Sequence, residues 1–296
     1  MTVHMEDVYL EYKSLLFSLA YRMTGSVTEA EDIVQDTFLA LASTDIQDIH
    51  HVKSYLCKAV TNRCLDLLKS ARWKREQYVG EWLPEPMLDA SETNDPLQTV
   101  IAEEAVSYGL LVLLENLPSM LRAVFVLRTV LDYEYSEIAA MLEMTEVNCR
   151  KKFSLARKKL AEAGYQAIVP QPNRTSGLVE QLMQAISKSD AKSLIGLLTK
   201  DAVFVSDGGG KVRAAIHPIF SDERITAFWM GVWPKWASHA TMQIRSMNGQ
   251  DGIAVYSEGQ LKMIIQITMN EEEDRIARLY MMVNPDKLAH LQKENE

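Results

Sequence analysis

Residues 55–69 read YLCKAVTNRCLDLLK, and this stretch decides how the first half of the chain folds. Its apolar side chains recur at helical spacing, so we expect a helix over about residues 53–75 with one side in the core. The opposite side is basic and carries Asn62, Arg63, Asp66, Lys69, Ser70, Trp73 and Lys74. Cations hold phosphates while an aromatic ring stacks on an unpaired base, so this side suits single-stranded or melting DNA. The alternative is a solvated basic helix whose Trp73 folds back on the core.

A second helix is expected over residues 28–42. Its core side is formed by Ala30, Ile33, Val34, Thr37, Ala40 and Leu41. The opposite side carries Asp32, Gln35, Asp36 and Leu39. An acidic helix face is usually just solvated. An exposed leucine among carboxylates favours a docking surface for a basic partner instead.

Residues 110–163 have the spacing of a helix-turn-helix. Thr145 is a suitable N-cap for the last helix, because its hydroxyl can accept an unpaired N–H of the first turn. An apolar stripe is formed by Cys149, Phe153, Ala156 and Leu160. Away from it point Arg150, Lys151, Ser154, Arg157 and Lys158. Outward cations on a second helix suit docking in the major groove, although many helical hairpins imitate this pattern.

The charge of the chain is uneven. Over all 296 residues the net charge is −9, which alone would argue against nucleic acid. Residues 53–75 nevertheless hold seven Lys and Arg against one Asp, and residues 145–175 hold seven against two acidic residues. Two short basic stretches in an acidic chain indicate phosphate contact at two places.

The composition is that of a globular protein, with 47% hydrophobic and 24% charged residues. No apolar run is long enough to cross a bilayer and the N-terminus lacks a basic-then-apolar leader, so we expect a cytoplasmic protein that does not bind membranes. Cys57, Cys64 and Cys149 have neither CxxC spacing nor a histidine cluster beside them. We therefore expect buried free thiols, with no disulfide framework and no metal site.

These helices resemble a known family. Residues 30–38, AEDIVQDTF, resemble the helix by which extracytoplasmic-function sigma factors grip the clamp coiled coil of RNA polymerase, and residues 55–69 resemble the helix that reads and opens the −10 element. The resemblance implies that core polymerase contacts Asp32, Gln35, Asp36 and Leu39. It places near the −10 strand Asn62, Arg63, Lys69, Arg72 and Trp73. The helix-turn-helix resembles the −35-reading domain of the same family, which implies −35 contacts from Arg150, Lys151, Ser154, Arg157 and Lys158.

The C-terminal part changes from helices alone to helices and strands. Two helices over residues 178–187 and 190–198 and a third near residues 221–234 accompany strands at 202–207, 240–247, 253–258, 261–269 and 275–283. This order resembles the SnoaL-like branch of the nuclear-transport-factor-2 (NTF2) superfamily, which implies a curved antiparallel sheet and a cone with a pocket. The acid and base candidates Asp207, His217, Asp222 and His239 are scattered along the chain. We therefore expect no enzyme activity and no cofactor, and a small ligand in the cone stays open.

Three motifs extend the resemblance to nearly the whole chain: WLPEP at residues 82–86, DGGGK at 207–211 and NPDKL at 284–288. They resemble a subgroup of these sigma factors in which a SnoaL-like extension is implied to replace a separate anti-sigma factor. The residues implied in regulatory contacts are Trp82, Pro84, Asp207, Gly208, Gly209, Gly210, Lys211, Asn284, Pro285, Asp286 and Lys287. DGGGK lacks the frame of a phosphate-binding P-loop, and a flexible hairpin is the simpler interpretation.

The sequence thus predicts a multi-domain protein with two all-α domains followed by an α+β NTF2-like cone. The expected parts are sigma region 2 (1–76), a linker (77–104), sigma region 4 (105–168) and a SnoaL-like domain (176–296). The predicted function is an alternative sigma factor with core RNA polymerase and promoter DNA as partners, modulated in cis by its last domain. The alternatives are a SnoaL-like enzyme or ligand sensor fused to a DNA-binding module, and a dimeric repressor that binds a palindrome without polymerase.

Overall fold

The computed structural model describes residues 5–43, 49, 51–76, 78–89, 107–163 and 176–293. Side chains of residues 71–76 lie outside this description, so Arg72 and Trp73 are placed only as positions on a helix. The chain forms two compact units. One comprises residues 1–76 and 110–168, and the other residues 77–109 and 169–296. The four separate parts expected from the sequence stay a prediction.

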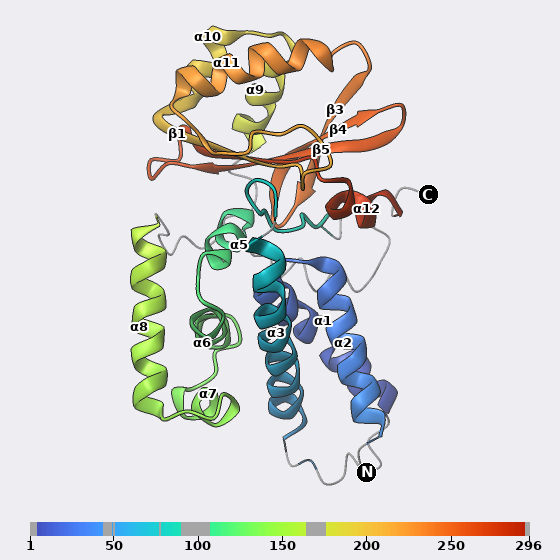
Figure 1. Cartoon of the computed structure of the whole chain (residues 1–296), viewed down its shortest axis with the longest axis vertical. Coiled ribbons are helices and arrows are strands. Elements are labelled where there is room, and N and C mark those ends of the chain that lie inside the picture. The colour runs from blue at the N-terminus through green and yellow to red at the C-terminus, as the bar shows by residue number, and fades with distance from the viewer. Residues whose placement is uncertain are drawn as a thin grey trace. The chain divides into compact units, whose positions relative to one another are not determined.

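The first unit is helical. Its elements are α1 (Met5–Thr24), α2 (Val27–Ala42), α3 (Val52–Glu76), α5 (Tyr108–Glu115, which begins in the segment of the second unit), α6 (Ser119–Thr129), α7 (Tyr135–Met141) and α8 (Glu146–Glu162) (Figure 1). The helices expected from apolar spacing are therefore confirmed to within about two residues. All three cysteines are free and buried, as expected, and burial raises the pKa of Cys64 to about 12.

The core side of α2 differs from the expectation at one position. Ala30, Ile33, Val34, Thr37 and Leu41 are buried as predicted. Ala40 is exposed, and the prediction for it is wrong. The larger side chain of Phe38 is buried instead. Its ring meets the Tyr9 ring edge-on, with the centroids 4.8 Å apart. A phenylalanine gains more from burial than an alanine, so the helix turns this position inward.

Helix α6 is buried on all sides. Residues 121–127 are seven consecutive buried positions, and α6 contacts α1 and α3 as well as α7 and α8. A helix that is apolar all round belongs in a core. Its one buried charge, Arg122, is satisfied by Glu115 Oε1 at 2.6 Å and the Met23 carbonyl at 2.5 Å. The sigma-like helices and the helix-turn-helix thus share one core.

The second unit is built on a six-stranded sheet of order β2-β1-β6-β5-β4-β3. The strands are β1 (Leu198–Asp207), β2 (Ile219–Phe220), β3 (Ala240–Met247), β4 (Gln250–Ser257), β5 (Gln260–Met269) and β6 (Ile276–Met282). Its helices are α9 (Ser176–Ser187), α10 (Ala191–Leu197), α11 (Asp222–Val232), the 3-10 turn η3 (Trp233–Lys235) and α12 (Pro285–Lys293). β1 pairs with β6 in parallel, so the sheet is mixed and the expectation of an antiparallel sheet is wrong at this pair.

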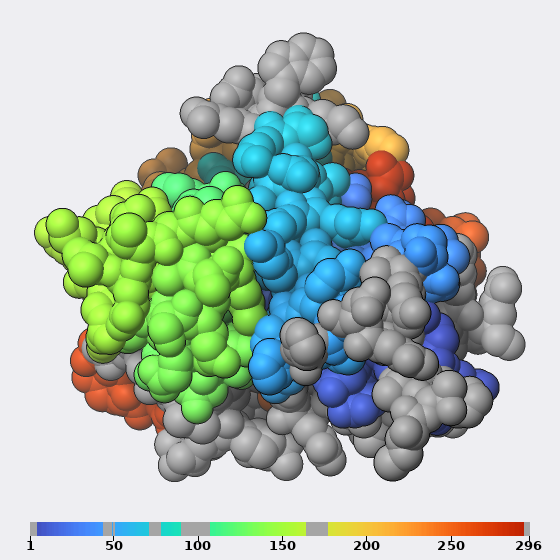
Figure 2. All heavy atoms as spheres, turned by 90° about the horizontal axis from the view of Figure 1, so that it is seen from below, coloured from blue at the N-terminus to red at the C-terminus, as the bar shows by residue number. Residues whose placement is uncertain are grey.

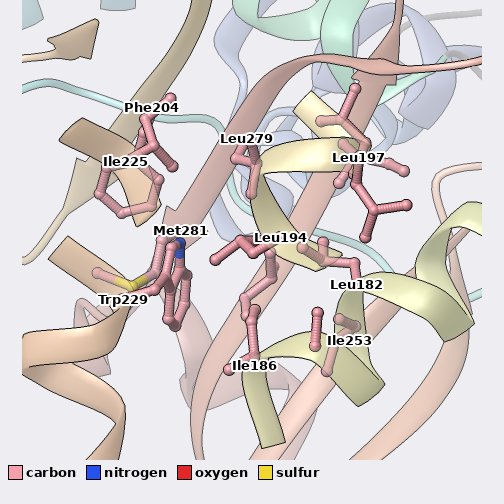
Figure 3. Close-up of a cluster of buried hydrophobic side chains, with 14 of the residues drawn as sticks. Leu182, Ile186, Leu194, Leu197, Phe204, Ile225, Trp229, Ile253, Leu279 and Met281 are labelled. Carbon is pink, nitrogen blue, oxygen red and sulfur yellow. The ribbon is translucent and has the colours of Figure 1, made fainter. Parts of the chain in front are cut away.

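The two faces of this sheet are covered differently. Helices α9, α10 and α11 lie over one face and α12 lies on the other (Figure 1). The core of the helix-covered face includes Phe204, Leu194, Trp229 and Met281 (Figure 3). Phe204 and Trp229 meet edge-on with centroids 5.9 Å apart. Large buried side chains thus lie between helices and sheet, where the cone was expected to hold a pocket.

Candidate functional site

The basic side of α3 presents the candidates for the −10 strand. Asn62 and Lys69 are exposed and Arg63 is half-buried. Arg63 donates to the Asp36 carbonyl at 3.2 Å, and Lys69 pairs with Asp66 at 2.8 Å. Both contacts are to solvent-exposed groups and are weak in energy, so a phosphate can replace them.

The acidic side of α2 is a separate surface. Asp32, Gln35, Asp36 and Leu39 are all exposed, and Leu39 has 64% of its surface in solvent. Ser26 caps the helix by accepting from the Glu29 N–H at 3.2 Å, which fixes where the helix starts and hence which side faces outward. An exposed leucine therefore lies beside exposed carboxylates on this side of α2.

The third surface is the outer side of α8. Thr145 accepts from the Asn148 N–H at 3.3 Å, so the predicted N-cap is confirmed. Exposed on this side are Arg150, Lys151, Ser154, Arg157 and Lys158. The Arg150 guanidinium is held by Glu146 at 2.5 Å and lies over the Tyr135 ring, 4.5 Å from its centroid. α8 and α3 belong to the same unit and appear in Figure 2 in green and light blue.

In the second unit, linker residues 78–89 meet the C-terminal domain at Asp207. This carboxylate is 0% exposed and accepts four hydrogen bonds. Oδ1 accepts from the Tyr78 hydroxyl at 2.5 Å and the Gly209 N–H at 3.0 Å. Oδ2 accepts from the Leu83 N–H at 2.9 Å and from Lys287 at 2.8 Å. A carboxylate offers about four acceptor positions, so the buried charge of Asp207 is fully satisfied.

Lys287 completes this centre and is 3% exposed. Its ammonium also donates to the Leu83 carbonyl at 2.5 Å and lies 3.2 Å from the centroid of the Trp82 ring. Because the Leu83 N–H donates to Asp207 and the Leu83 carbonyl accepts from Lys287, both ions of one buried pair hold the same linker residue. We call Tyr78, Trp82, Leu83, Asp207 and Lys287 the linker site.

Tyr78 lies just before WLPEP and contacts both DGGGK and NPDKL. Its hydroxyl donates to Asp207 and accepts from Asn284 Nδ2 at 2.8 Å. Burial, together with the bond to the Asp207 carboxylate, raises the pKa of Tyr78 above its ordinary value of 10.0. The phenol therefore stays protonated and remains a donor.

The glycines of DGGGK are required by close approach. Gly209 has φ of +59°, and a Cβ there would lie 2.3 Å from Asn284 Nδ2. A Cβ on Gly208 would lie 2.3 Å from the Val212 carbonyl oxygen. The motif is therefore a tight turn packed on NPDKL, and the Lys211–Asp286 ion pair closes its exposed side at 2.5 Å.

Pro285 and Pro84 have backbone roles. Pro285 is the first residue of α12, where its fixed φ suits a helix start and its missing N–H costs nothing. The Pro84 carbonyl accepts from the Tyr108 hydroxyl at 2.8 Å. Tyr108 is buried and also meets the Tyr280 ring edge-on, with centroids 5.6 Å apart.

Sequence reasoning missed several linker contacts. Tyr78 and Tyr108 were not singled out, although Tyr78 holds the start of the described linker on the domain and Tyr108 joins Pro84 of the linker to the Tyr280 ring of the domain. It also missed Asn248, which pairs with Met87 through two bonds of 2.9 and 3.1 Å. Asp89 was missed as well; it accepts from Ser246 at 2.6 Å and from the Gly249 N–H at 2.9 Å.

The four acid and base candidates are in use elsewhere or exposed. Asp207 belongs to the linker site, and Asp222 pairs with Lys200 at 2.6 Å. That hydrogen bond from Lys200 lowers the pKa of Asp222. His217 and His239 are both exposed. The described residues thus bring no pair of these candidates together for proton transfer.

Two protein-family models match the helices of the first unit. Residues 8–74 match the family Sigma-70 region 2, and residues 109–160 match the family Sigma-70, region 4. The chain therefore contains regions 2 and 4 of a sigma factor, and its helical unit defines it as a member of this class of proteins. It belongs to the family of extracytoplasmic-function (ECF) sigma factors and is an alternative sigma factor that directs transcription.

The family assignment rests on similarity over nearly the whole length. The chain is 31% identical to "ECF RNA polymerase sigma factor SigJ" of Mycobacterium tuberculosis, covering 93% of this chain and 90% of that protein. It is 27% identical to SigG of the same species, covering 65% of this chain and 58% of that protein. The crystal structure of SigJ superposes with a TM-score of 0.76 at 28% identity, covering 95% of this chain and 97% of that one. The superposition on SigJ thus includes the sheet domain as well as the helical unit.

Among residues that the structure describes, no helix is both long and apolar enough to span a membrane.

Proposed function

We propose that this sigma factor contacts core RNA polymerase through the acidic side of α2, the −10 element through α3 and the −35 element through α8. The observation that carries the proposal is that the exposed basic sides of α3 and α8 fall inside the two matched sigma regions. Cations that keep their solvent exposure can neutralise phosphates, and an acidic side with an exposed leucine cannot serve that purpose. Polymerase and DNA are thus assigned to different surfaces.

Charge reversal on α2 tests the polymerase contact. Asp36→Arg together with Leu39→Ala should weaken binding to core polymerase at least tenfold and abolish promoter-specific run-off transcription. Glu6→Arg on α1, also an exposed carboxylate, is the matched control and should bind normally. Equal binding by the α2 variant would remove the polymerase assignment.

The C-terminal domain is proposed to modulate this activity in cis by holding the linker. Tyr78 and Leu83 near the start of the linker and Tyr108, which follows the linker as the first residue of α5, are all bonded within the second unit. Because both ends of this segment are anchored on one domain, the distance between them cannot exceed the diameter of that domain. A domain of about 120 residues has a radius of gyration of roughly 14 Å, so the anchored ends stay within about 35 Å.

A promoter requires a larger separation. Elements near −10 and −35 lie about 25 base pairs apart, or roughly 85 Å of B-DNA at about 3.4 Å per base pair. Linker residues 77–109, once released, can extend to roughly 110 Å at about 3.3 Å per residue. We therefore propose that the linker site helps to keep the −10 and −35 helices close together. Promoter engagement then requires release of the linker together with separation of α6 from α1 and α3.

Weakening one anchor tests the regulation without touching DNA or polymerase contacts. Tyr108→Phe removes only the hydroxyl that donates to the Pro84 carbonyl and keeps the ring against Tyr280. It should change run-off transcription severalfold while core binding stays unchanged. Tyr256→Phe, which removes a hydroxyl that accepts from Arg245 within the sheet, is the control for loss of a hydroxyl. Unchanged transcription by Tyr108→Phe and also by Trp82→Ala would discard regulation through the linker.

The other roles weighed for the C-terminal domain gain less support. An enzyme would need an acid and a base facing a pocket, whereas Asp207 and Asp222 are each paired with a lysine. A small ligand inside the cone would have to displace side chains such as Phe204 and Trp229. A groove of about 380 Å³ lies outside that core, between α9 and α10, and is lined by Gln181, Lys188 and Ser193 among others. We propose that the cone serves as a scaffold for the linker.

A further inference from the structure

The side chains of α8 fall into three rows around the helix. Cys149, Ala156 and Leu160 are buried. At about 100° per residue the row directly opposite is formed by Val147, Lys151, Ser154 and Lys158. All four of these side chains are exposed. When the buried row rests on the helix-turn-helix core, the opposite row is the one that points straight into a groove.

The flanks of the helix carry further cations. Arg150 and Arg157 lie on one flank, while Lys152 and Lys159 lie on the other. A helix in the major groove has the two phosphate backbones on its flanks and the base edges beneath its central row. The arginines and lysines of the flanks are therefore placed for phosphates, and the central row is placed for bases.

Val147 is the first residue of the central row and the only apolar one. It is 64% exposed, in the first turn of α8, and Thr145 caps that turn. The preceding residue, Glu146, is held by Arg150 at 2.5 Å and does not cover it. First-turn side chains of a recognition helix are those that reach base edges, and the apolar group on a major-groove edge is the C5 methyl of thymine.

We propose that Val147 reads a thymine methyl group in the −35 element. This inference rests on the proposed role of α8 in −35 binding and adds the base that one position selects. Lys151 follows in the same row about 6 Å further along the helix axis. That rise corresponds to one or two base-pair steps of about 3.4 Å, so the selected T·A pair lies within two steps of the pair that Lys151 contacts, where guanine is preferred.

The test pairs a methyl on the protein with a methyl on the DNA. Promoter binding by the full-length chain with core polymerase is measured on a −35 sequence selected from a randomised library. Each thymine of that sequence is then replaced in turn by deoxyuridine, which removes only the C5 methyl. One replacement should weaken wild-type binding about fourfold, the value of one buried methyl group. Val147→Ala removes the two methyl groups that extend furthest from the helix, so the same replacement should have a clearly smaller effect, and alanine keeps the helix because its helix propensity is higher.

Leu155→Ala is the matched control. Leu155 is another exposed apolar residue of α8, 46% exposed, but it lies outside the central row. This variant should keep the full sensitivity to deoxyuridine. The inference is overturned if wild-type binding tolerates every thymine replacement, or if Val147→Ala retains the loss. If the wild-type holoenzyme selects no −35 sequence from the library at all, the proposed role of α8 fails, which is a distinguishable result.

Discussion

Arg157 and Lys158 on α8 stand in solvent, whereas Lys287 at the start of α12 is buried against Asp207, Leu83 and Trp82. Side-chain cations are thus used in two ways. Exposed cations keep their hydration and bind an anion that arrives from outside. A buried cation has lost its water and must be satisfied by the chain itself.

This difference separates surfaces that bind partners from the centre that holds the linker. A buried ion pair adds little net stability against an apolar pair of similar volume, but removing one partner is costly. The linker site is therefore stable only when both ions are present, and loss of either one strongly destabilises it. On α3 and α8 the loss of one cation removes one contact and leaves the fold unchanged.

Asp207→Ala should give the largest effect. It leaves the ammonium of Lys287 buried without its carboxylate, at a cost of about 3–5 kcal/mol in the stability of the second unit. Urea unfolding should show this loss, and amide hydrogen exchange should rise in residues 78–89. Adding Lys287→Met removes the unpaired charge and should recover part of the stability. If the double variant is no more stable than Asp207→Ala, the cost does not come from the buried charge.

Tyr78→Phe should have the next largest effect. It removes a donor to a charged acceptor, worth about 1.5–3 kcal/mol, while the ring can stay against Trp82. Because the pKa of Tyr78 is raised on folding, its contribution is complete below pH 10 and is lost as pH rises beyond that value. Hydrogen exchange of the linker segment, compared between the two proteins, measures the effect. Equal protection at neutral pH would show that the hydroxyl does not hold the linker.

The residues of these two predictions show which features could be predicted from the sequence and which could not. Helices α2, α3 and α8 could be predicted because each has a continuous apolar stripe, and the Thr145 cap follows from local chemistry. The structure brings Trp82, Asp207, Gly209, Asn284 and Lys287 into one centre. Those residues were singled out by resemblance, and their regulatory role stays a prediction.

The partners of these residues had no local signal. Tyr78 lies 129 residues before Asp207 and 206 before Asn284, so its contacts exist only after the sheet has formed. Tyr108 likewise meets Pro84 and Tyr280 from far along the chain. The parallel pairing of β1 with β6 was missed for the same reason, since strand spacing predicts neighbours along the chain but not a crossover.

Arg157→Ala should leave stability nearly unchanged and act on DNA binding alone. The side chain is exposed, so we expect a change in stability of less than about 0.5 kcal/mol. Loss of one phosphate contact should lower the slope of log affinity against log salt by about one and weaken binding to all −35 sequences alike. Fluorescence anisotropy over a salt series measures the slope. An unchanged slope would remove Arg157 from the phosphate contacts.

Lys211→Ala should have the smallest effect among the substitutions in the second unit and is the sharpest test of the comparison. Lys211 carries the same charge as Lys287, belongs to a neighbouring motif and forms an even shorter ion pair, with Asp286 at 2.5 Å against 2.8 Å. Both side chains of that pair are more than half exposed, so its loss should cost less than about 1 kcal/mol and weaken further in high salt. Hydrogen exchange of residues 78–89 should stay near that of the wild type. A loss comparable to that of Asp207→Ala would mean that burial does not decide which lysine holds the linker.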